Sequence, residues 1–248
     1  MTKGIVFDHV SFHYPDKADV VRDVTFTVRS GDFVGITGVN GSGKSTLTYC
    51  MNGLIPHSIP GSLHGGVTVD GVDTKEKSVS YLSHSVGMVF QNPDFSLFNL
   101  TVAEEVAFGL KNLKGTVNRQ AIADALALVG LAGFENRDPQ TLSFGEKQKV
   151  NLASVLALDV SYIVLDEPTA MLDHRSSVEL YQLLKRLNEK GKTIIVVEHD
   201  TDFLWDFASS MLVISGGLIV SEGETREVLS NKKLLSSLGI KKPQGVRV

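Results

Sequence analysis

The sequence has few features of a secreted, membrane-spanning or nucleic-acid-binding protein. Cys50 is its only cysteine, which excludes an internal disulfide and a cysteine-rich zinc site and suits a reducing compartment. No apolar run approaches the roughly 18 residues that cross a bilayer, and the opening MTKGIVFDHV lacks the apolar core of a signal peptide. Lysine and arginine total 24 against 28 acidic residues, so the formal charge of -4 provides no basic field for nucleic acid. We therefore expect no nucleic-acid partner, and we expect any membrane component to be another chain.

Short apolar segments alternate with longer segments of helical spacing along most of the 248 residues. The alternating stretch 23–29 and the apolar stretch 33–37 predict an antiparallel sheet that leads into a core strand. Further short apolar runs stand at 67–69, 86–90, 162–166 and 193–199. Because helical stripes separate these runs, the pattern predicts an α/β fold with a largely parallel sheet. Near the end, Gly216 and Gly217 predict a hairpin that is followed by a charged tail.

The segment GVNGSGKST follows the predicted strand 33–37 and precedes a helix-compatible stretch. Its glycines let the backbone wrap closely around a triphosphate, so that N–H groups face the negative charge. Lys44 would add a positive charge at the terminal phosphates, and Ser45 would add a hydroxyl ligand for Mg²⁺. A glycine-rich turn without a ligand is the alternative, and the flanking strand and helix weigh against it. We expect an ATP-binding P-loop whose contacts are Gly38, Asn40, Gly41, Ser42, Gly43, Lys44, Ser45 and Thr46.

Two carboxylates follow the apolar run in SYIVLDEP. Ligands bind at the carboxyl ends of strands in open α/β sheets, and this is where Asp166 and Glu167 are expected to lie. Asp166 would hold Mg²⁺, directly or through water, and Glu167 would polarise the attacking water. An acidic pair after a strand is often only a solvated loop, but a P-loop upstream favours the functional interpretation. The pair predicts hydrolysis of the nucleotide.

The segment TLSFGEKQKV, residues 141–150, lies between these two motifs. Its core LSFGE ends 20 residues before Asp166, by 166 minus 146, and resembles the LSGGQ signature of the ATP-binding cassette (ABC) family. The resemblance covers nearly the whole chain. It implies a P-loop NTPase (RecA-like) core with an N-terminal antiparallel β-subdomain and an α-helical signature subdomain.

The same resemblance implies roles for several further residues. Tyr14 stands where the family stacks an aromatic ring on adenine, and Gln91 in VFQNPD stands where a glutamine senses Mg²⁺ and the membrane partner. Asp173 ends AMLD, which is similar to the loop that touches the opposite subunit, and His199 in VEHD is similar to the switch histidine at the γ-phosphate. Alone, Tyr14 or His199 would more often be a packed or solvent-facing residue, but six elements stand in the family's order. The implied catalytic residues are Glu167, His199, Gln91 and Lys44, and the implied Mg²⁺ ligands are Ser45, Gln91 and Asp166.

The signature differs from the family pattern at Phe144 and Glu146. Ser143 and Glu146 also form a capping-box pattern at the start of a helix, worth about 1 kcal/mol. Both interpretations are compatible, because a capping serine can still donate to phosphate; Ser143 and the Gly145 N–H can then serve the signature. The added charge of Glu146 leads to the hypothesis of a weakened composite site in an asymmetric dimer.

The segment QNPDFSLFNLTVAEEVAFGLKNL resembles the energy-coupling factor (cobalt-type) importers of vitamins and metal ions, and differs from them at Phe95 and Ser96. This resemblance implies a second ABC ATPase subunit, with a heterodimer favoured, a transmembrane scaffold and a small substrate-binding membrane protein. It also implies a peripheral position at the cytoplasmic face of the cell membrane. We expect one ABC ATPase domain, with a nucleotide-binding core and β-subdomain at about 1–91 and 159–223, a helical subdomain at about 92–158, and a C-terminal tail at 224–248.

Three alternatives remain open at this stage. The chain could serve another ABC importer, or it could be a soluble ABC ATPase without a transport role, which would share every nucleotide motif. The importer-like segment after Gln91 and the lack of a long coiled-coil insertion weigh against the soluble ATPase. A non-catalytic regulatory subunit is favoured only by the altered signature, and the intact Lys44, Asp166, Glu167 and His199 weigh against it.

Overall fold

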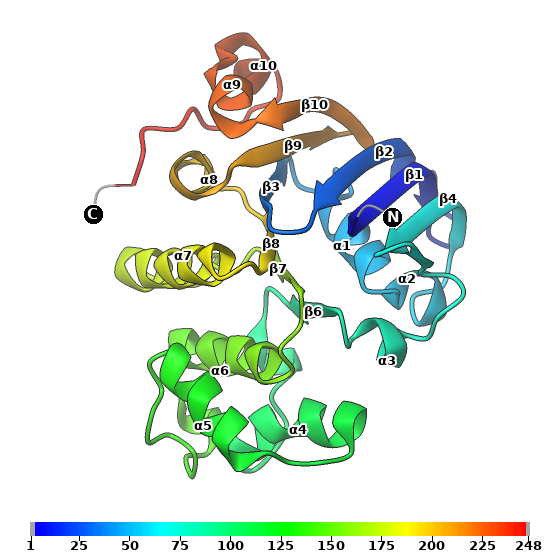
Figure 1. The fold of residues 1–248 in the computed structure, drawn as a ribbon. Coiled ribbons are helices and arrows are strands. Elements are labelled where there is room, and N and C mark those ends of the chain that lie inside the picture. Colours follow the sequence, from blue (N-terminus) through cyan, green and yellow to red (C-terminus); the bar gives the residue numbers. More distant parts are fainter. Residues whose placement is uncertain (1–2, 247–248) are drawn as a thin grey trace.

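A six-stranded sheet forms the centre of the computed structural model, which describes residues 3–246 (Figure 1). The strands lie in the spatial order β10 (Leu218–Glu224), β9 (Ser210–Ser215), β3 (Phe33–Gly38), β8 (Thr193–Val197), β7 (Tyr162–Asp166) and β6 (Val86–Val89). The pairs from β9 to β6 are parallel, whereas β10 runs antiparallel to β9. Strands β3, β7 and β8 are buried along their whole length, as expected for near-continuous apolar runs. The predicted parallel sheet is confirmed.

An antiparallel sheet packs beside this central sheet and confirms the second part of the predicted fold. It consists, in spatial order, of β2 (Val21–Arg29), β1 (Gly4–His13), β4 (Ser62–Val69) and β5 (Val72–Asp73). Its inner face shares one hydrophobic core with helix α1 (Lys44–Met51) and one face of the central sheet. Phe7 and Phe26 stack in this core with ring centroids 4.4 Å apart. Cys50 is buried here, and burial raises the pKa of its thiol to about 12, so the thiol is a structural hydrophobe, as expected.

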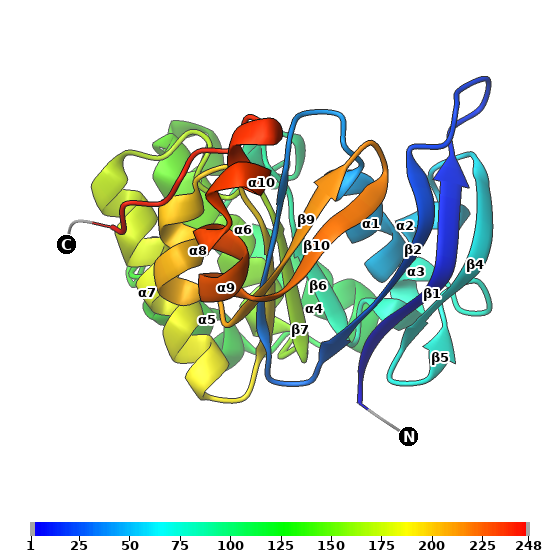
Figure 2. The same ribbon diagram turned by 90° about the horizontal axis from the view of Figure 1, so that it is seen from above.

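Helices cover the other face of the central sheet and extend away from it (Figures 1 and 2). They are α4 (Val102–Lys114), α5 (Arg119–Leu128), α6 (Phe144–Ala157) and α7 (His174–Glu189), with a 3-10 turn at Pro139–Thr141. The apolar stripes predicted for 122–129 and 180–187 are buried in this second core. A 3-10 turn at Pro93–Phe95 completes this part, whereas two one-turn helices, α2 (Leu54–His57) and α3 (Val79–Leu82), pack in the first core with α1 and β4. None of the helices within residues 3–246 has the length and apolarity to cross a bilayer.

The C-terminal region differs from the charged tail that the sequence predicted. The chain does turn at Gly216 and Gly217, as predicted, and strand β10 then leads into α9 (Thr225–Ser230) and α10 (Lys232–Ser237). These helices bury Val228, Leu229 and Leu235 against α8 (Thr201–Phe207) and β9 (Figure 2). Three apolar side chains spread over two very short helices give no clear period, which is why the sequence pattern did not reveal them.

Candidate functional site

The P-loop connects β3 to α1, as the sequence predicted. Gly43 has φ +106°, and a Cβ there would lie 2.6 Å from the carbonyl oxygen of Val20. A Cβ on Gly38, at φ +155°, would lie 2.1 Å from the carbonyl oxygen of Ile214. Both contacts are shorter than a carbon–oxygen contact allows. The loop can therefore follow this path only with glycine at these two positions.

Lys44 is held inside the loop rather than in solvent. The residue is 5% exposed, and its Nζ donates to the carbonyl oxygens of Gly38 at 3.0 Å and Val39 at 3.2 Å. Burial lowers the pKa of Lys44, and the nearby carboxylates of Glu167 and Asp166 oppose that shift. The ammonium group is thus positioned by the backbone at the point where the loop would enclose a phosphate chain.

A cavity of about 490 Å³ opens over the loop. Its lining residues are Tyr14, Lys17, Val20, Asn40, Gly41, Gly43, Lys44, Ser45, Thr46, Gln91 and Glu167. The hydroxyl groups of Tyr14 and Thr46 are 3.1 Å apart, which connects the proposed adenine-stacking residue to α1. Ser42 is buried and does not line the cavity. Lys17 and Val20 were not predicted from the sequence; the basic Lys17, three positions after Tyr14, was the available signal.

Glu167 lies between two of the predicted catalytic side chains. The Gln91 Nε2 donates to Glu167 Oε2 at 2.8 Å, and the His199 Nε2 is 2.8 Å from Glu167 Oε1. Glu167 has φ +48°, which is uncommon outside glycine and typical of functional sites. Gln91 follows β6, Glu167 follows β7 and His199 follows β8, so the carboxyl ends of three adjacent strands bring these groups together.

Asp166 has the environment expected of a metal-binding carboxylate. It is 5% exposed, and within residues 3–246 its Oδ1 is buried without a hydrogen-bond partner. Burial raises the pKa of Asp166, and a hydrogen bond from Ser45 opposes that shift. In the described part of the chain, no group of three or more His, Cys, Asp or Glu side chains is arranged to hold a metal ion by itself. The donors therefore fit a Mg²⁺ that takes only a few protein oxygens, from Ser45, Asp166 and Gln91, and completes its shell with phosphate and water.

Helix α6 begins at the altered signature, and the predicted capping box is confirmed. The Ser143 Oγ accepts from the Glu146 N–H at 3.3 Å and donates to Glu146 Oε2 at 2.8 Å, while the Ser143 N–H donates to the same oxygen at 2.8 Å. The Ser143 hydroxyl and then its backbone N–H lower the pKa of Glu146, so the carboxylate stays ionised. Phe144 is an ordinary helical residue of the first turn, so its position does not require glycine for a positive φ.

The residues assigned to the opposite-subunit contact lie apart from the P-loop cavity. Ser143, Gly145 and Asp173 do not line it. A Cβ on Gly145 would face Leu172 and Ser176, and Asp173 caps α7 by accepting from the Ser176 N–H at 2.8 Å. The chain therefore assembles the P-loop, Gln91, the carboxylates and His199 into one site, and it places the signature elsewhere on its surface.

The comparisons with known proteins agree with this geometry. The ABC transporter family matches residues 21–170. A Pyrococcus abyssi protein, named provisionally as an ABC transporter ATP-binding protein, is 48% identical over 98% of this chain and 89% of its own length. The energy-coupling factor transporter ATP-binding protein EcfA of Methanocaldococcus jannaschii is 40% identical over 94% of this chain and 83% of its own length.

Solved structures share the fold. CbiO1 of Clostridium perfringens, part of the ABC transporter complex cbiONQ, superposes with a TM-score of 0.82 at 28% identity, covering 97% of this chain and 96% of its own. A dimeric ATP-binding cassette bound to ADP and Pi superposes with a TM-score of 0.78 at 29% identity, covering 90% of this chain and 99% of its own.

Proposed function

This chain belongs to the ABC transporter family and is an ATPase, and from that premise we propose that it powers import of a vitamin or metal ion by an energy-coupling factor type transporter. In this proposal the chain is one ABC ATPase domain. Its core with the β-subdomain spans about 1–91 and 159–223, its helical subdomain spans 92–158, and its C-terminal segment spans 224–248. Relatives named EcfA and a structural neighbour from the cbiONQ complex support this assignment.

The site chemistry supports a hydrolytic role. Glu167 is within hydrogen-bond distance of two groups that can adjust its position, Gln91 and His199, and so can act as the general base for water. Lys44, fixed by two carbonyl oxygens, would stabilise charge on the terminal phosphates, and His199 would add to this at the γ-phosphoryl. Bound Mg²⁺, held by Ser45, Asp166 and Gln91, would neutralise phosphate charge.

One surface feature carries the transport part of the proposal. A groove of about 390 Å³ runs between the end of β6 and α4, and its wall includes Phe90, Phe98 and Phe108. Phe95 is 88% exposed and Leu100 is 82% exposed close by in the sequence. A concentration of exposed large apolar side chains marks an interaction surface. Because Phe90 directly precedes Gln91, a partner in this groove would contact the backbone beside the residue that donates a hydrogen bond to Glu167.

A buried carboxylate supports the wall of this groove. Glu105 is 6% exposed, and its Oε2 accepts from the N–H groups of Phe98 at 3.0 Å and Asn99 at 2.9 Å, and from the Asn99 side chain at 3.0 Å. Three donors on one carboxylate oxygen fix the loop that presents the aromatic residues. The groove is therefore preorganised for a membrane partner, which we propose to be the transmembrane scaffold, with a separate small membrane protein capturing the substrate.

We also place a second cassette in the assembly. Tyr14 and the P-loop of one subunit would face Ser143, Gly145 and Asp173 of the other. Within one chain, these three residues do not line the cavity over the P-loop. ATP would close the pair, hydrolysis would reset it, and the pair would sit at the cytoplasmic face of the cell membrane. We favour a heterodimer, because Glu146 places an ionised carboxylate beside the signature serine and weakens the composite site that this chain serves.

The test is purification of the tagged chain from detergent-solubilised membranes, with the co-purifying chains identified by mass spectrometry. Small multi-span proteins together with a second cassette are the expected result. Phe98→Asp should lose the multi-span proteins and keep the second cassette, because it puts a charge into the groove. Leu218→Asp, at a position 40% exposed on β10, is the matched control and should lose neither. Recovery with soluble partners alone would contradict the importer role and favour a soluble ABC ATPase.

A further inference from the structure

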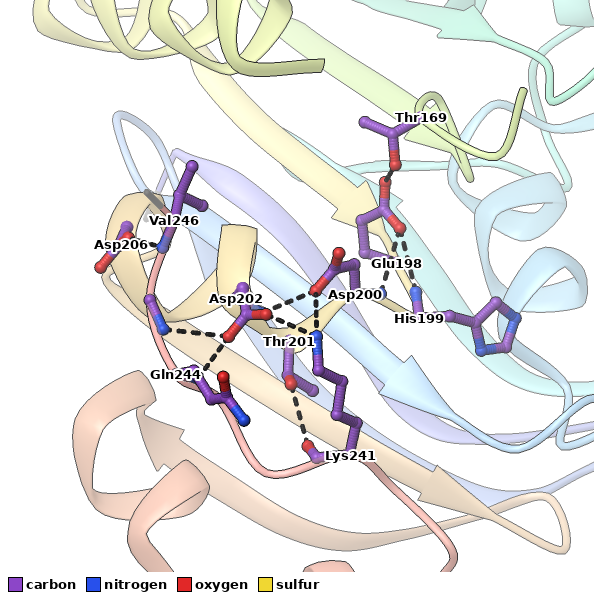
Figure 3. Close-up of polar contacts among 11 residues, drawn as sticks. Thr169, Glu198, His199, Asp200, Thr201, Asp202, Asp206, Lys241, Gln244 and Val246 are labelled. Atoms are coloured by element: carbon purple, nitrogen blue, oxygen red, sulfur yellow. Dashed lines mark hydrogen bonds and ion pairs between the residues drawn. The ribbon is translucent and has the colours of Figure 1, made fainter. Parts of the chain in front are cut away.

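A buried carboxylate with no assigned role lies directly before the switch histidine. Glu198 follows β8 and is 3% exposed. Its Oε2 accepts from the N–H of His199 at 3.0 Å and, more weakly, from the N–H of Asp200 at 3.4 Å. Its other oxygen, Oε1, accepts from the hydroxyl of Thr169 (Figure 3). Within residues 3–246 this buried acid is thus held by hydroxyl groups and two backbone amides, and no cation is paired with it.

These partners belong to the two segments that carry the proposed catalytic pair, Glu167 and His199. Thr169 lies two residues after Glu167, and His199 contacts Glu167 at 2.8 Å. A second bond joins the same segments, because the Glu167 N–H donates to the Val197 carbonyl at 2.9 Å. Glu198 therefore bridges the backbone that carries the base to the backbone that carries the histidine, from the buried side and without touching the cavity.

The far side of the switch segment is anchored independently. Asp202, near the start of α8, accepts from Lys241 Nζ at 2.5 Å and from the N–H of Gly245 at 3.0 Å, and the Thr201 hydroxyl donates to the Lys241 carbonyl at 2.9 Å (Figure 3). Loss of the Glu198 side chain would therefore release the backbone at His199, whereas Asp200 stays anchored, because its Oδ1 accepts from the Asp202 N–H at 3.0 Å and lies 3.7 Å from Lys241 Nζ.

We propose that Glu198 is a positioning residue for ATP hydrolysis, which sets the switch histidine against Glu167 by holding the His199 backbone and the Thr169 hydroxyl with one buried carboxylate. It makes no contact with nucleotide or water itself. A displacement of the histidine by even about 1 Å can cost on the order of a hundredfold in rate, so loss of this bridge should appear in turnover rather than in binding.

The test compares Glu198→Ala, Glu198→Gln and Thr193→Val in the full-length chain. Glu198→Ala is expected to lower kcat by roughly tenfold to a hundredfold, with KM for ATP within about threefold of the parent. Glu198→Gln should stay within about threefold in both constants, because its amide oxygen still accepts the N–H bonds and its NH₂ can donate to Thr169. Thr193→Val is the matched control. It removes a buried hydroxyl at the opposite end of β8, which accepts from the Gly31 N–H at 2.9 Å, and should leave kcat unchanged.

A second readout needs no turnover. Amide hydrogen exchange of peptides spanning 197–202 should accelerate by roughly tenfold per lost bond in Glu198→Ala, and should stay at the parental rate in Glu198→Gln and Thr193→Val. Equal kcat values for Glu198→Ala and Thr193→Val would overturn the proposal, as would parental exchange in Glu198→Ala. Both readouts report on the ATP site alone, so their outcome does not depend on which solute is transported or on which membrane proteins bind the chain.

Discussion

The two halves of the proposed ATP site are built in opposite ways. The P-loop half draws its groups from distant segments, because Lys44, Gln91, Glu167 and His199 converge only where the ends of neighbouring strands meet. The signature half is the start of a single helix, α6, held by its own capping box at Ser143. The first half therefore depends on the whole sheet. The second half is complete as local structure, and in the proposed dimer it would complete the nucleotide site of the other subunit.

The largest expected effect tests whether the P-loop half is catalytic. Glu167→Gln should lower ATP turnover by roughly 10² to 10⁴ while nucleotide affinity is kept, because the general base is lost and the P-loop is not. Lys44→Ala is the counterpart and should weaken nucleotide binding by roughly a hundredfold, since a charged contact worth about 1.5–3 kcal/mol is removed. Turnover and equilibrium binding of both variants give the answer. Parental turnover in Glu167→Gln, or parental affinity in Lys44→Ala, would contradict these assignments.

The next effect contrasts one buried carboxylate with one exposed carboxylate. Burial raises the pKa of Glu198 from 4.5 to about 7, so between these values the folded chain binds a proton that the unfolded chain releases. The contribution of Glu198 to the free energy of unfolding should therefore fall by about 3 kcal/mol as pH rises from 4.5 to 7. The pKa of Glu146 is shifted in the opposite direction. Because it is lowered, the contribution of Glu146 to the free energy of unfolding is present above its ordinary pKa and is lost as pH falls.

Urea unfolding of the parent and Glu198→Gln at pH 5 and pH 8 measures the Glu198 contribution. The parent should lose about 3 kcal/mol more than the variant between the two pH values. Groups that titrate in both proteins cancel in this difference. An identical pH dependence would mean that Glu198 is not desolvated in the folded chain.

The smallest effect concerns the signature half. Glu146→Gln should raise ATP turnover of the assembled pair by roughly threefold to tenfold, because it removes a negative charge from the helix start that would face phosphate. Glu104→Gln is a closely matched control. Glu104 holds the same third position in the capping box of α4, whose cap is Thr101, so both changes weaken a cap and only one alters the signature. If the two variants behave alike, the weakened-site hypothesis is wrong.

Much of this molecule could be predicted because its signals are local. Glycine spacing around Lys44, the apolar run before Asp166 and the Ser143-x-x-Glu146 pattern each depend on a few neighbouring residues, and the structure contains the loop, the buried strand and the capping box. The predicted nucleotide roles of these residues remain predictions. The packed helices α9 and α10 were missed because their three buried apolar side chains have no period of their own and are defined by contact with α8 and β9.

The sequence alone determined the fold class, the family resemblance and the chemical identity of the P-loop. Backbone geometry and helix capping impose particular residues at fixed short spacings, and these spacings are visible in the sequence. Tertiary structure alone decided that Gln91 and His199 share the carboxylate of Glu167, that Ser143 lies away from the cavity, and that Glu198 joins His199 to Thr169. Those relations join residues up to 76 positions apart. Sequence spacing does not encode such contacts, because the order of strands in the sheet determines which strand ends become neighbours.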